Sequence, residues 1–177
     1  SALIALVPRH PQRFDEVAAL VARADLPVIR RSANSLPSAS TRVWLGDSMG
    51  EMAAWYALAD LALMGGGWLP LGGQNLIEAC ASGCPVIVGP HTFNFAQAAE
   101  DAIEAGAALR ASDVGAAARQ AAALLAEPER LSAMAGAGRA FSQAHGGATM
   151  RTLARIQPRL RVPQRAAQTA TPPRPLP

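Results

Sequence analysis

Several features that would assign this chain to a familiar class are absent from its 177 residues. There is no Lys, and no apolar run reaches the ~18 residues that a membrane-spanning helix needs. Aromatic residues make up only 5% of the chain, and basic and aromatic side chains do not alternate, so we expect no nucleic-acid partner. Neither G-x-G-x-x-G nor G-x-x-x-x-G-K-[ST] occurs, which excludes the two best-known glycine-rich phosphate signatures.

Cysteine and catalytic signatures are also scarce. Cys80 and Cys84 are the only cysteines, and the three His lie far from them in sequence, so we expect small core residues and no metal site. No Ser-His-Asp order, HExxH or acidic metal cluster occurs. Asp47, Glu51 and Glu78 suit capping or sugar-binding roles better than that of a general base. We therefore expect no catalytic residue, metal or cofactor in this chain.

The charge that is present is unevenly placed. All 16 basic residues are Arg; eight of them lie in residues 130–177, which hold no acid, and the other eight share residues 1–129 with all 13 acids. The C-terminal part therefore carries +8 and the rest −5, which gives the net charge of +3. This asymmetry predicts an anionic partner for the C-terminal part, such as a membrane surface, although a solvated basic tail would have the same composition.

Short apolar runs alternate with helical periods along the chain. Half of the residues are hydrophobic, enough to bury a core. The chain opens directly on a strand pattern, without Met or a secretory signal, which suggests one domain of a longer protein. Strands are predicted at 3–7, 27–30, 42–45, 61–64, 85–88 and 107–110, the first of them fully buried, and helices at 13–24, 49–58, 76–82, 95–105, 114–126, 128–144 and 148–156.

Strands that alternate with helices in this way predict right-handed βαβ units. We therefore expect an α/β fold with a Rossmann-like, doubly wound parallel sheet, covered on both faces, and additional C-terminal helices. Residues 1–156 form the predicted domain. Residues 157–177 are rich in Pro and Arg and lack a helical period, so we expect a disordered tail.

Sheets of this kind bind ligands at the carboxyl ends of their strands. Three turns occupy such positions, namely Pro8-Arg9-His10, Gly46–Glu51 and Gly65–Glu78. In the first, prolines on both sides stiffen the turn, and an Arg there can fork onto a phosphate or carboxylate. In the second, Asp47 or Ser48 can cap the following helix. His91 follows another strand and is a weaker candidate.

The third turn contains Gly72-Gly73, followed by Asn75 and Glu78. A capping arrangement explains it if Asn75 is the N-cap and Glu78 the third helical residue. A nucleotide site explains it as well, because glycines let the backbone approach a ligand, a helix N-terminus attracts phosphate, and a carboxylate accepts hydrogen bonds from ribose hydroxyls. The residues leave both interpretations open.

Four segments together resemble one enzyme family. They are VPRHPQRF at 7–14, LGDSMGEM at 45–52, GG-x-N-L-I-E-A at 72–79 and VGPHTFNF at 88–95. In the same order they resemble the C-terminal half of the 3-deoxy-D-manno-octulosonic acid (Kdo) transferases, over about residues 2–156. The resemblance implies a GT-B glycosyltransferase of lipopolysaccharide biosynthesis, which transfers Kdo from CMP-Kdo to a lipid A precursor at the cytoplasmic face of the bacterial inner membrane. It also implies CMP contacts at Pro8, Arg9, Met49, Gly50, Glu51, Asn75, Leu76, Ile77 and Glu78.

The family's membrane anchor, acceptor domain and proposed catalytic Glu belong to an N-terminal half without counterpart in these residues. We therefore expect this chain to bind the donor nucleotide without transferring Kdo. Two alternatives remain, namely a GT-B enzyme with a UDP-sugar donor and a non-enzymatic nucleotide-binding module.

Overall fold

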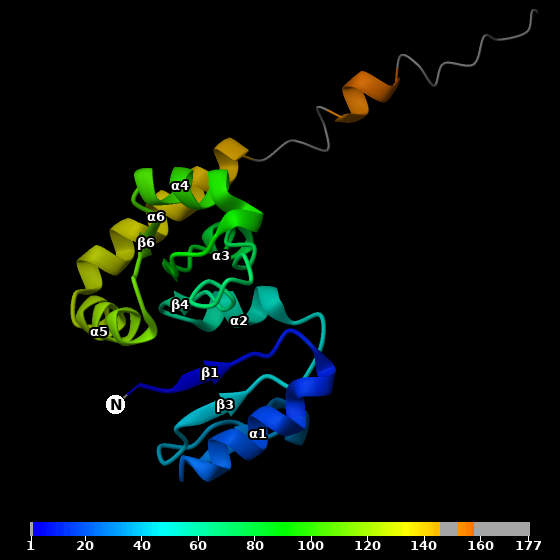
Figure 1. Ribbon diagram of the computed structural model, residues 1–177, viewed down its shortest axis with the longest axis vertical. Helices are drawn as coiled ribbons and strands as arrows, with labels where there is room; N and C mark the ends of the chain where they lie inside the picture. The colour runs from blue at the N-terminus through cyan, green and yellow to red at the C-terminus, as the bar shows by residue number, and fades with distance from the viewer. Residues whose placement is uncertain (1, 146–151, 158–177) are drawn as a thin grey trace, which may run out of the picture. The chain divides into compact units, whose positions relative to one another are not determined.

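Parallel strands and helices alternate in the computed structural model, which describes residues 2–145 and 152–157 (Figure 1). The chain divides into two units after Ala144. The elements are β1 (Ile4–Leu6), α1 (Phe14–Arg23), β2 (Val28–Arg30), β3 (Val43–Leu45), α2 (Met52–Leu58), β4 (Ala62–Leu63), α3 (Ile77–Ala81), β5 (Val86–Val88), α4 (Ala96–Glu104), β6 (Ala108–Arg110), α5 (Val114–Leu125) and α6 (Pro128–His145). The predicted α/β class is confirmed.

The strands form two three-stranded parallel sheets, whereas the alternating pattern predicted a single sheet. In the first, β3 lies between β1 and β2, with Ile4 and Val28 both opposite Val43. In the second, β5 lies between β4 and β6, with Val86 opposite Ala62 and Ala108. Each sheet keeps the parallel pairing that βαβ connections produce.

The second sheet carries most of the core. All three residues of β5 are buried; α3 and α4 contribute to one core cluster, α5 to a second cluster around Ile87, and α6 to both. Cys80 and Cys84 lie inside the first of these clusters as free thiols, as expected. Burial raises the pKa of Cys80 to about 11 and that of Cys84 to about 12, so both behave as small apolar side chains.

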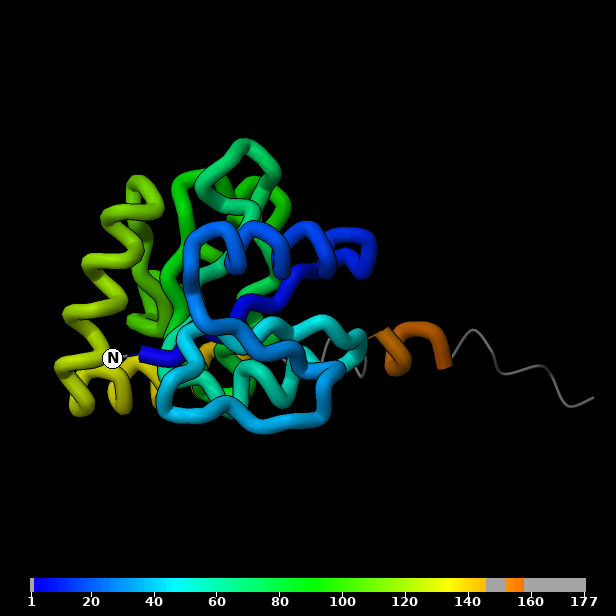
Figure 2. The backbone as a smooth tube through the Cα atoms, turned by 90° about the horizontal axis from the view of Figure 1, so that it is seen from below, coloured from blue at the N-terminus to red at the C-terminus, as the bar shows by residue number. Residues whose placement is uncertain are grey.

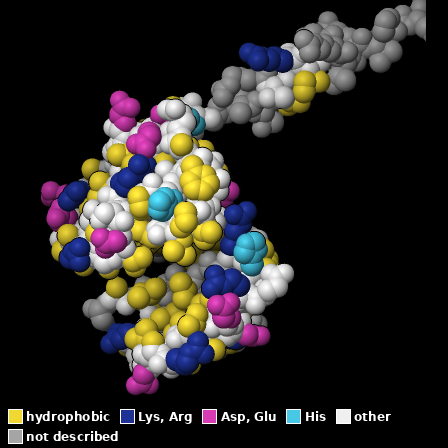
Figure 3. Space-filling view, in the orientation of Figure 1, with side chains coloured by type: hydrophobic (Ala, Val, Ile, Leu, Met, Phe, Trp, Pro, Cys, Tyr) yellow, Lys and Arg dark blue, Asp and Glu magenta, His cyan; other side chains and the backbone are white. Residues whose placement is uncertain are grey.

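The first sheet is thinner, and one expectation about it was wrong. Helix α1 covers β3 through Val17 and Val21 (Figures 1 and 2). Strand β1 is not fully buried, since Ile4 is 54% and Leu6 38% exposed. It is an edge strand paired only with β3, and the buried side chains of α1 pack against those of β3 instead. Hydrophobic side chains therefore remain visible over this part of the surface (Figure 3).

Helix α2 contacts residues of both sheets. Its buried Trp55 meets Trp44 of β3 edge to face, with ring centroids 4.7 Å apart. The neighbouring Tyr56 donates its hydroxyl to Sδ of Met64, just after β4, at 3.7 Å. This helix follows the Gly46–Glu51 turn directly, so its packing fixes one end of that turn.

The second unit is described only in part. Residues 152–157 are helical, which agrees with part of the helix predicted at 148–156. The predicted tail at 157–177 lies almost entirely outside the described residues, and the predicted domain boundary at 156 stays a prediction. Within residues 2–145 and 152–157, no helix has both the length and the apolar character that crossing a bilayer demands.

Candidate functional site

A direct side-chain contact joins the first and third predicted turns. Nη1 of Arg9, which follows β1, donates a hydrogen bond to Oε1 of Gln74 at 2.8 Å. Gln74 immediately precedes Asn75 in the loop that leads to α3. Two segments 65 residues apart in sequence therefore meet at the carboxyl ends of their strands. The guanidinium of Arg9 remains exposed and can take a second partner.

Glycine residues determine the path of the loop between β4 and α3. Gly72 and Gly73 have φ of +88° and +76°, a region that other residues rarely adopt. The Gly72 carbonyl accepts a hydrogen bond from the backbone N–H of Asn94, and a side chain at Gly72 would overlap those of Asn94 and Phe93. The loop is thus held against the segment after β5, and both glycines are buried, with no room at Gly72 for a larger residue.

The start of α3 corrects the predicted cap. The helix begins at Ile77 with Leu76 as its N-cap, so Asn75 lies one position earlier and Glu78 is the second helical residue. Oδ1 of Asn75 accepts the N–H of Ile77 at 3.0 Å, and its Nδ2 donates to Oε1 of Glu78 at 3.4 Å. Part of the capping interpretation is therefore present, as a local turn with an exposed Glu78 carboxylate.

Leu76 and Ile77 contribute differently from their polar neighbours. Leu76 is buried and Ile77 packs against the same core cluster, while the Leu76 carbonyl accepts from the N–H of Cys80 and the Ile77 N–H donates to Asn75.

The second turn differs from the predicted one at its cap. Helix α2 begins at Met52 with Glu51 as N-cap, and neither Asp47 nor Ser48 caps it. Gly50 has a φ of +79°, which interrupts the helical path, and the two predicted caps bind elsewhere. Ser48 donates to Oε2 of Glu51, and Nη2 of Arg31 reaches Oε1 of the same carboxylate at 2.9 Å.

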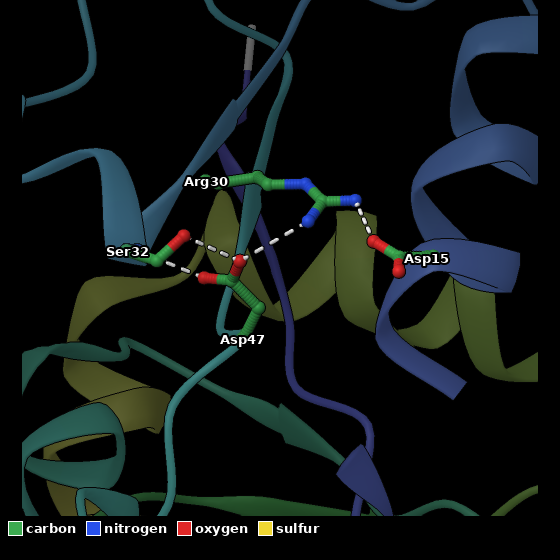
Figure 4. Close-up of polar contacts among 4 residues, drawn as sticks. All are labelled: Asp15, Arg30, Ser32 and Asp47. Atoms are coloured by element: carbon green, nitrogen blue, oxygen red, sulfur yellow. Dashed lines mark hydrogen bonds and ion pairs between the residues drawn. The ribbon is translucent and has the colours of Figure 1, made fainter. Parts of the chain in front are cut away.

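Asp47 accepts hydrogen bonds from both donors of a single serine (Figure 4). The N–H of Ser32 donates to Oδ1 at 2.8 Å and its hydroxyl to Oδ2 at 2.6 Å, while Nη1 of Arg30 lies 3.6 Å from Oδ2. Burial by itself raises the pKa of Asp47, but the hydrogen bonds from Ser32 and the charge of Arg30 outweigh it and hold the pKa below its usual value.

Met49 and Gly50 lie between these fixed residues and project outward. Met49 is 62% exposed, and no atom approaches the position that a side chain on Gly50 would occupy. A cavity of about 380 Å³ lies beside the turn, lined in part by Arg31, Trp44, Glu51 and Trp55. The turn thus presents free backbone groups next to a partly aromatic hollow.

The depressed pKa of Asp47 predicts a loss of stability in acid. A carboxyl whose folded pKa lies below its unfolded value, near 4, stabilises the fold above that value and loses this contribution as pH falls through the folded pKa. Below about pH 4 we expect the free energy of unfolding to decrease. The difference in this free energy between wild type and Asp47→Asn should also become smaller there. Urea unfolding at pH 7, 5, 4 and 3 measures both; a constant gap would contradict the assignment.

Four residues of the site were not predicted from the sequence, namely Arg30, Arg31, Ser32 and Gln74. Arg30 ends β2 and the next two residues follow it, so the rule that ligands gather at the carboxyl ends of strands applies to them as well. Gln74 stood within a predicted turn without being singled out. His10 and His91 are both exposed; the His10 carbonyl accepts from the N–H of Arg13, and the N–H of His91 donates to the Gly67 carbonyl.

Within the described residues, no group of three His, Cys, Asp or Glu side chains could hold a metal ion.

Comparison with known proteins gives consistent matches. The family model described as "Glycosyl transferases group 1" matches residues 23–141. The chain is 61% identical over 152 residues to a 3-deoxy-D-manno-octulosonic acid transferase of Bordetella pertussis, and 40% identical over 159 residues to one of Haemophilus influenzae. These matches cover 85% and 89% of this chain, but only 36% and 37% of the relatives, so the chain spans about a third of their length.

Solved structures agree with these matches. The crystal structure of the C-terminal CMP-Kdo binding domain of WaaA from Acinetobacter baumannii aligns with a TM-score of 0.76 at 38% identity, covering 80% of this chain and 74% of that one. The glycotransferase of kitacinnamycin aligns with a TM-score of 0.50 at 23% identity, covering 89% of this chain and 43% of that one. The second match speaks for the fold alone.

Proposed function

Because the chain belongs to the glycosyl transferases group 1 family, and within it to the C-terminal domains of Kdo transferases, we propose that its three strand-end turns bind the CMP part of CMP-Kdo. The contact that carries this proposal is the hydrogen bond between Arg9 and Gln74. It places an exposed guanidinium beside the glycine loop and the start of α3. An anion at this position would meet the positive charge of Arg9, whose remaining guanidinium N–H groups can donate to it.

Each turn offers a different part of a nucleotide site. Arg9, supported by Pro8, is suited to the phosphate because guanidinium binds phosphate oxygens in a two-pronged geometry. The exposed carboxylate of Glu78 is suited to ribose hydroxyls, with Asn75 holding it in place at 3.4 Å. The exposed backbone of Met49 and Gly50 supplies further donors and acceptors.

Glu51, in contrast, already accepts from Ser48 and Arg31. In this proposal it orients the second turn and leaves much of the direct contact to the backbone. In this proposal Leu76 and Ile77 contribute the packing that holds α3 in place.

The activity of the whole protein is part of the same proposal. In this proposal the whole protein transfers Kdo from CMP-Kdo to a lipid A precursor in lipopolysaccharide biosynthesis, at the cytoplasmic face of the inner membrane. Arg9 then stabilises the charge on the departing CMP phosphate. We expect the 177 residues alone to bind CMP without transfer, and the Arg-rich C-terminal segment to favour anionic membrane surfaces.

Calorimetric titration of this chain with CMP, UMP and UDP tests the proposal. CMP should bind most tightly, since CMP is the leaving group of the proposed donor. A preference for UDP would favour a glycosyltransferase with a UDP-sugar donor. Binding of none of the three would contradict the proposal for this chain.

A further inference from the structure

We propose that Asp47 and Ser32 are positioning residues for nucleotide binding, which lock the turn after β2 onto the turn after β3 and so hold Met49 and Gly50 in their binding conformation. This inference rests on the proposed function, because it concerns how one of the three CMP-binding turns is held in place. Neither residue belongs to the proposed set of CMP contacts.

The first contact that joins the two turns is made by the carboxylate of Asp47, whose side chain is only 4% exposed. Its two oxygens accept separately from Ser32, through the N–H at 2.8 Å and the hydroxyl at 2.6 Å (Figure 4). A buried carboxylate without such partners would be costly, and these bonds satisfy both oxygens. Asp47 is therefore committed to its neighbours and acts on a ligand only through the turn.

The second contact between the two turns lies on the other side of Met49 and Gly50. Arg31 donates to Glu51 at 2.9 Å and, through Nη1, to Oδ1 of Asn34 at 3.2 Å. Consecutive residues after β2 thus hold both Asp47 and Glu51, one on each side of Met49 and Gly50.

Met49 and Gly50, between Asp47 and Glu51, make few contacts of their own. Gly50 has a φ of +79°, and its surroundings are empty within 4 Å of where a side chain would begin. Glycine loses more conformational freedom on ordering than any other residue. The conformation of the turn therefore depends on its fixed ends, and loosening one end adds an ordering cost to ligand binding.

Arg30 provides an internal control. Its Nη1 faces Asp47 at 3.6 Å, while its Nη2 pairs with Asp15 on α1 at 2.5 Å (Figure 4). Asp15 is 89% exposed and does not touch Ser32 or Asp47 in the contacts drawn, so its removal leaves the hydrogen bonds between Ser32 and Asp47 in place. Asp15→Asn and Asp47→Asn make the same chemical change at the two ends of one Arg.

The test is calorimetric titration of CMP into the 177-residue chain at 15 °C and pH 7, beside thermal melting of each variant. We expect Ser32→Ala and Asp47→Asn each to raise the Kd for CMP about fivefold to tenfold, since each loses one or more charge-assisted bonds. Ser32→Thr, which keeps both donors, should restore the wild-type Kd. Asp15→Asn should leave it within about twofold, as expected for an exposed pair.

A purely structural role would lower the melting temperature without changing the Kd where the variants are fully folded. Faster amide hydrogen exchange at Met49 and Gly50 in Ser32→Ala, but not in Asp15→Asn, is the expected nucleotide-free signature. If Asp47→Asn fails to fold, Ser32→Ala decides, because it keeps the backbone bond to Asp47.

The outcomes separate the two proposals. If wild type binds CMP and folded Ser32→Ala binds it equally well, the positioning role is overturned while the proposed function stands. If wild type does not bind CMP, the proposed function fails and the positioning role fails with it.

Discussion

Arg9→Ala and Glu78→Ala are each expected to weaken CMP binding by about 10- to 100-fold, which corresponds to losing a hydrogen bond in which one partner is charged. Arg9 contacts Gln74 through one nitrogen, and the remaining donors of its guanidinium are available for a phosphate. Glu78 is exposed, so its loss removes an acceptor without opening the core. Calorimetry on folded protein measures both effects.

Two matched controls accompany these variants. Arg130 and Glu127 form an exposed ion pair at 3.4 Å near the start of α6, far from the three turns in sequence. Replacing either with Ala changes the net charge as the test variants do, and the Kd for CMP should stay within about twofold. An unchanged Kd in both Arg9→Ala and Glu78→Ala would remove these residues from the site.

Arg9→Lys refines the test. Lys keeps the charge but presents a single ammonium in place of the planar fork. We expect a Kd between those of wild type and Arg9→Ala.

Gly89→Ala is expected to destabilise the fold by about 3 kcal/mol, at the upper end of typical overpacking costs. The new methyl group would overlap the backbone of Gly67 and lie 2.7 Å from the N of Trp68. These are main-chain atoms of the β4–α3 loop, which cannot turn aside as a side chain can. For a chain of this size the melting temperature should fall by about 6–12 °C. Thermal and urea unfolding measure the change.

Gly136→Ala is the control for this substitution. Gly136 lies inside α6, and its Cβ position has no neighbour within 4 Å. Alanine there should stabilise the helix by about 0.5–1 kcal/mol because it restricts the unfolded chain and favours helix. If the two substitutions destabilised the protein equally, the close approach of Gly67 and Gly89 would not explain the result.

The sequence predicted the order and type of the elements well, because buried strands and amphipathic helices leave local patterns. Predicted bounds of β2 and β5 differ from the structure by one residue. The prediction that β1 is fully buried was wrong. An apolar run is compatible with an edge strand, and the run itself does not reveal what covers it. The division into two sheets likewise depends on contacts between distant segments.

Within the site, the positions of the turns were predictable and their side-chain partners were not. Asp47 and Ser48 stand where helix caps are common, but Asp47 binds Ser32, 15 residues earlier, and Ser48 binds Glu51. Such pairings depend on how β2 and β3 align. The link between Arg9 and Gln74 spans 65 residues and could not be read from either motif.

The resemblance to Kdo transferases, based on four segments in order, is confirmed by the matches to the relatives and to the solved C-terminal domain. The roles of individual residues within those segments stay predictions.

The most direct test of the central proposal is to follow the backbone amide signals of the chain by NMR while CMP is added. We expect saturable shifts concentrated at Arg9, at Met49–Glu51 and at Asn75–Glu78, with little change along α5 and α6. Saturable shifts confined to other parts of the chain, with these three turns unaffected, would contradict it.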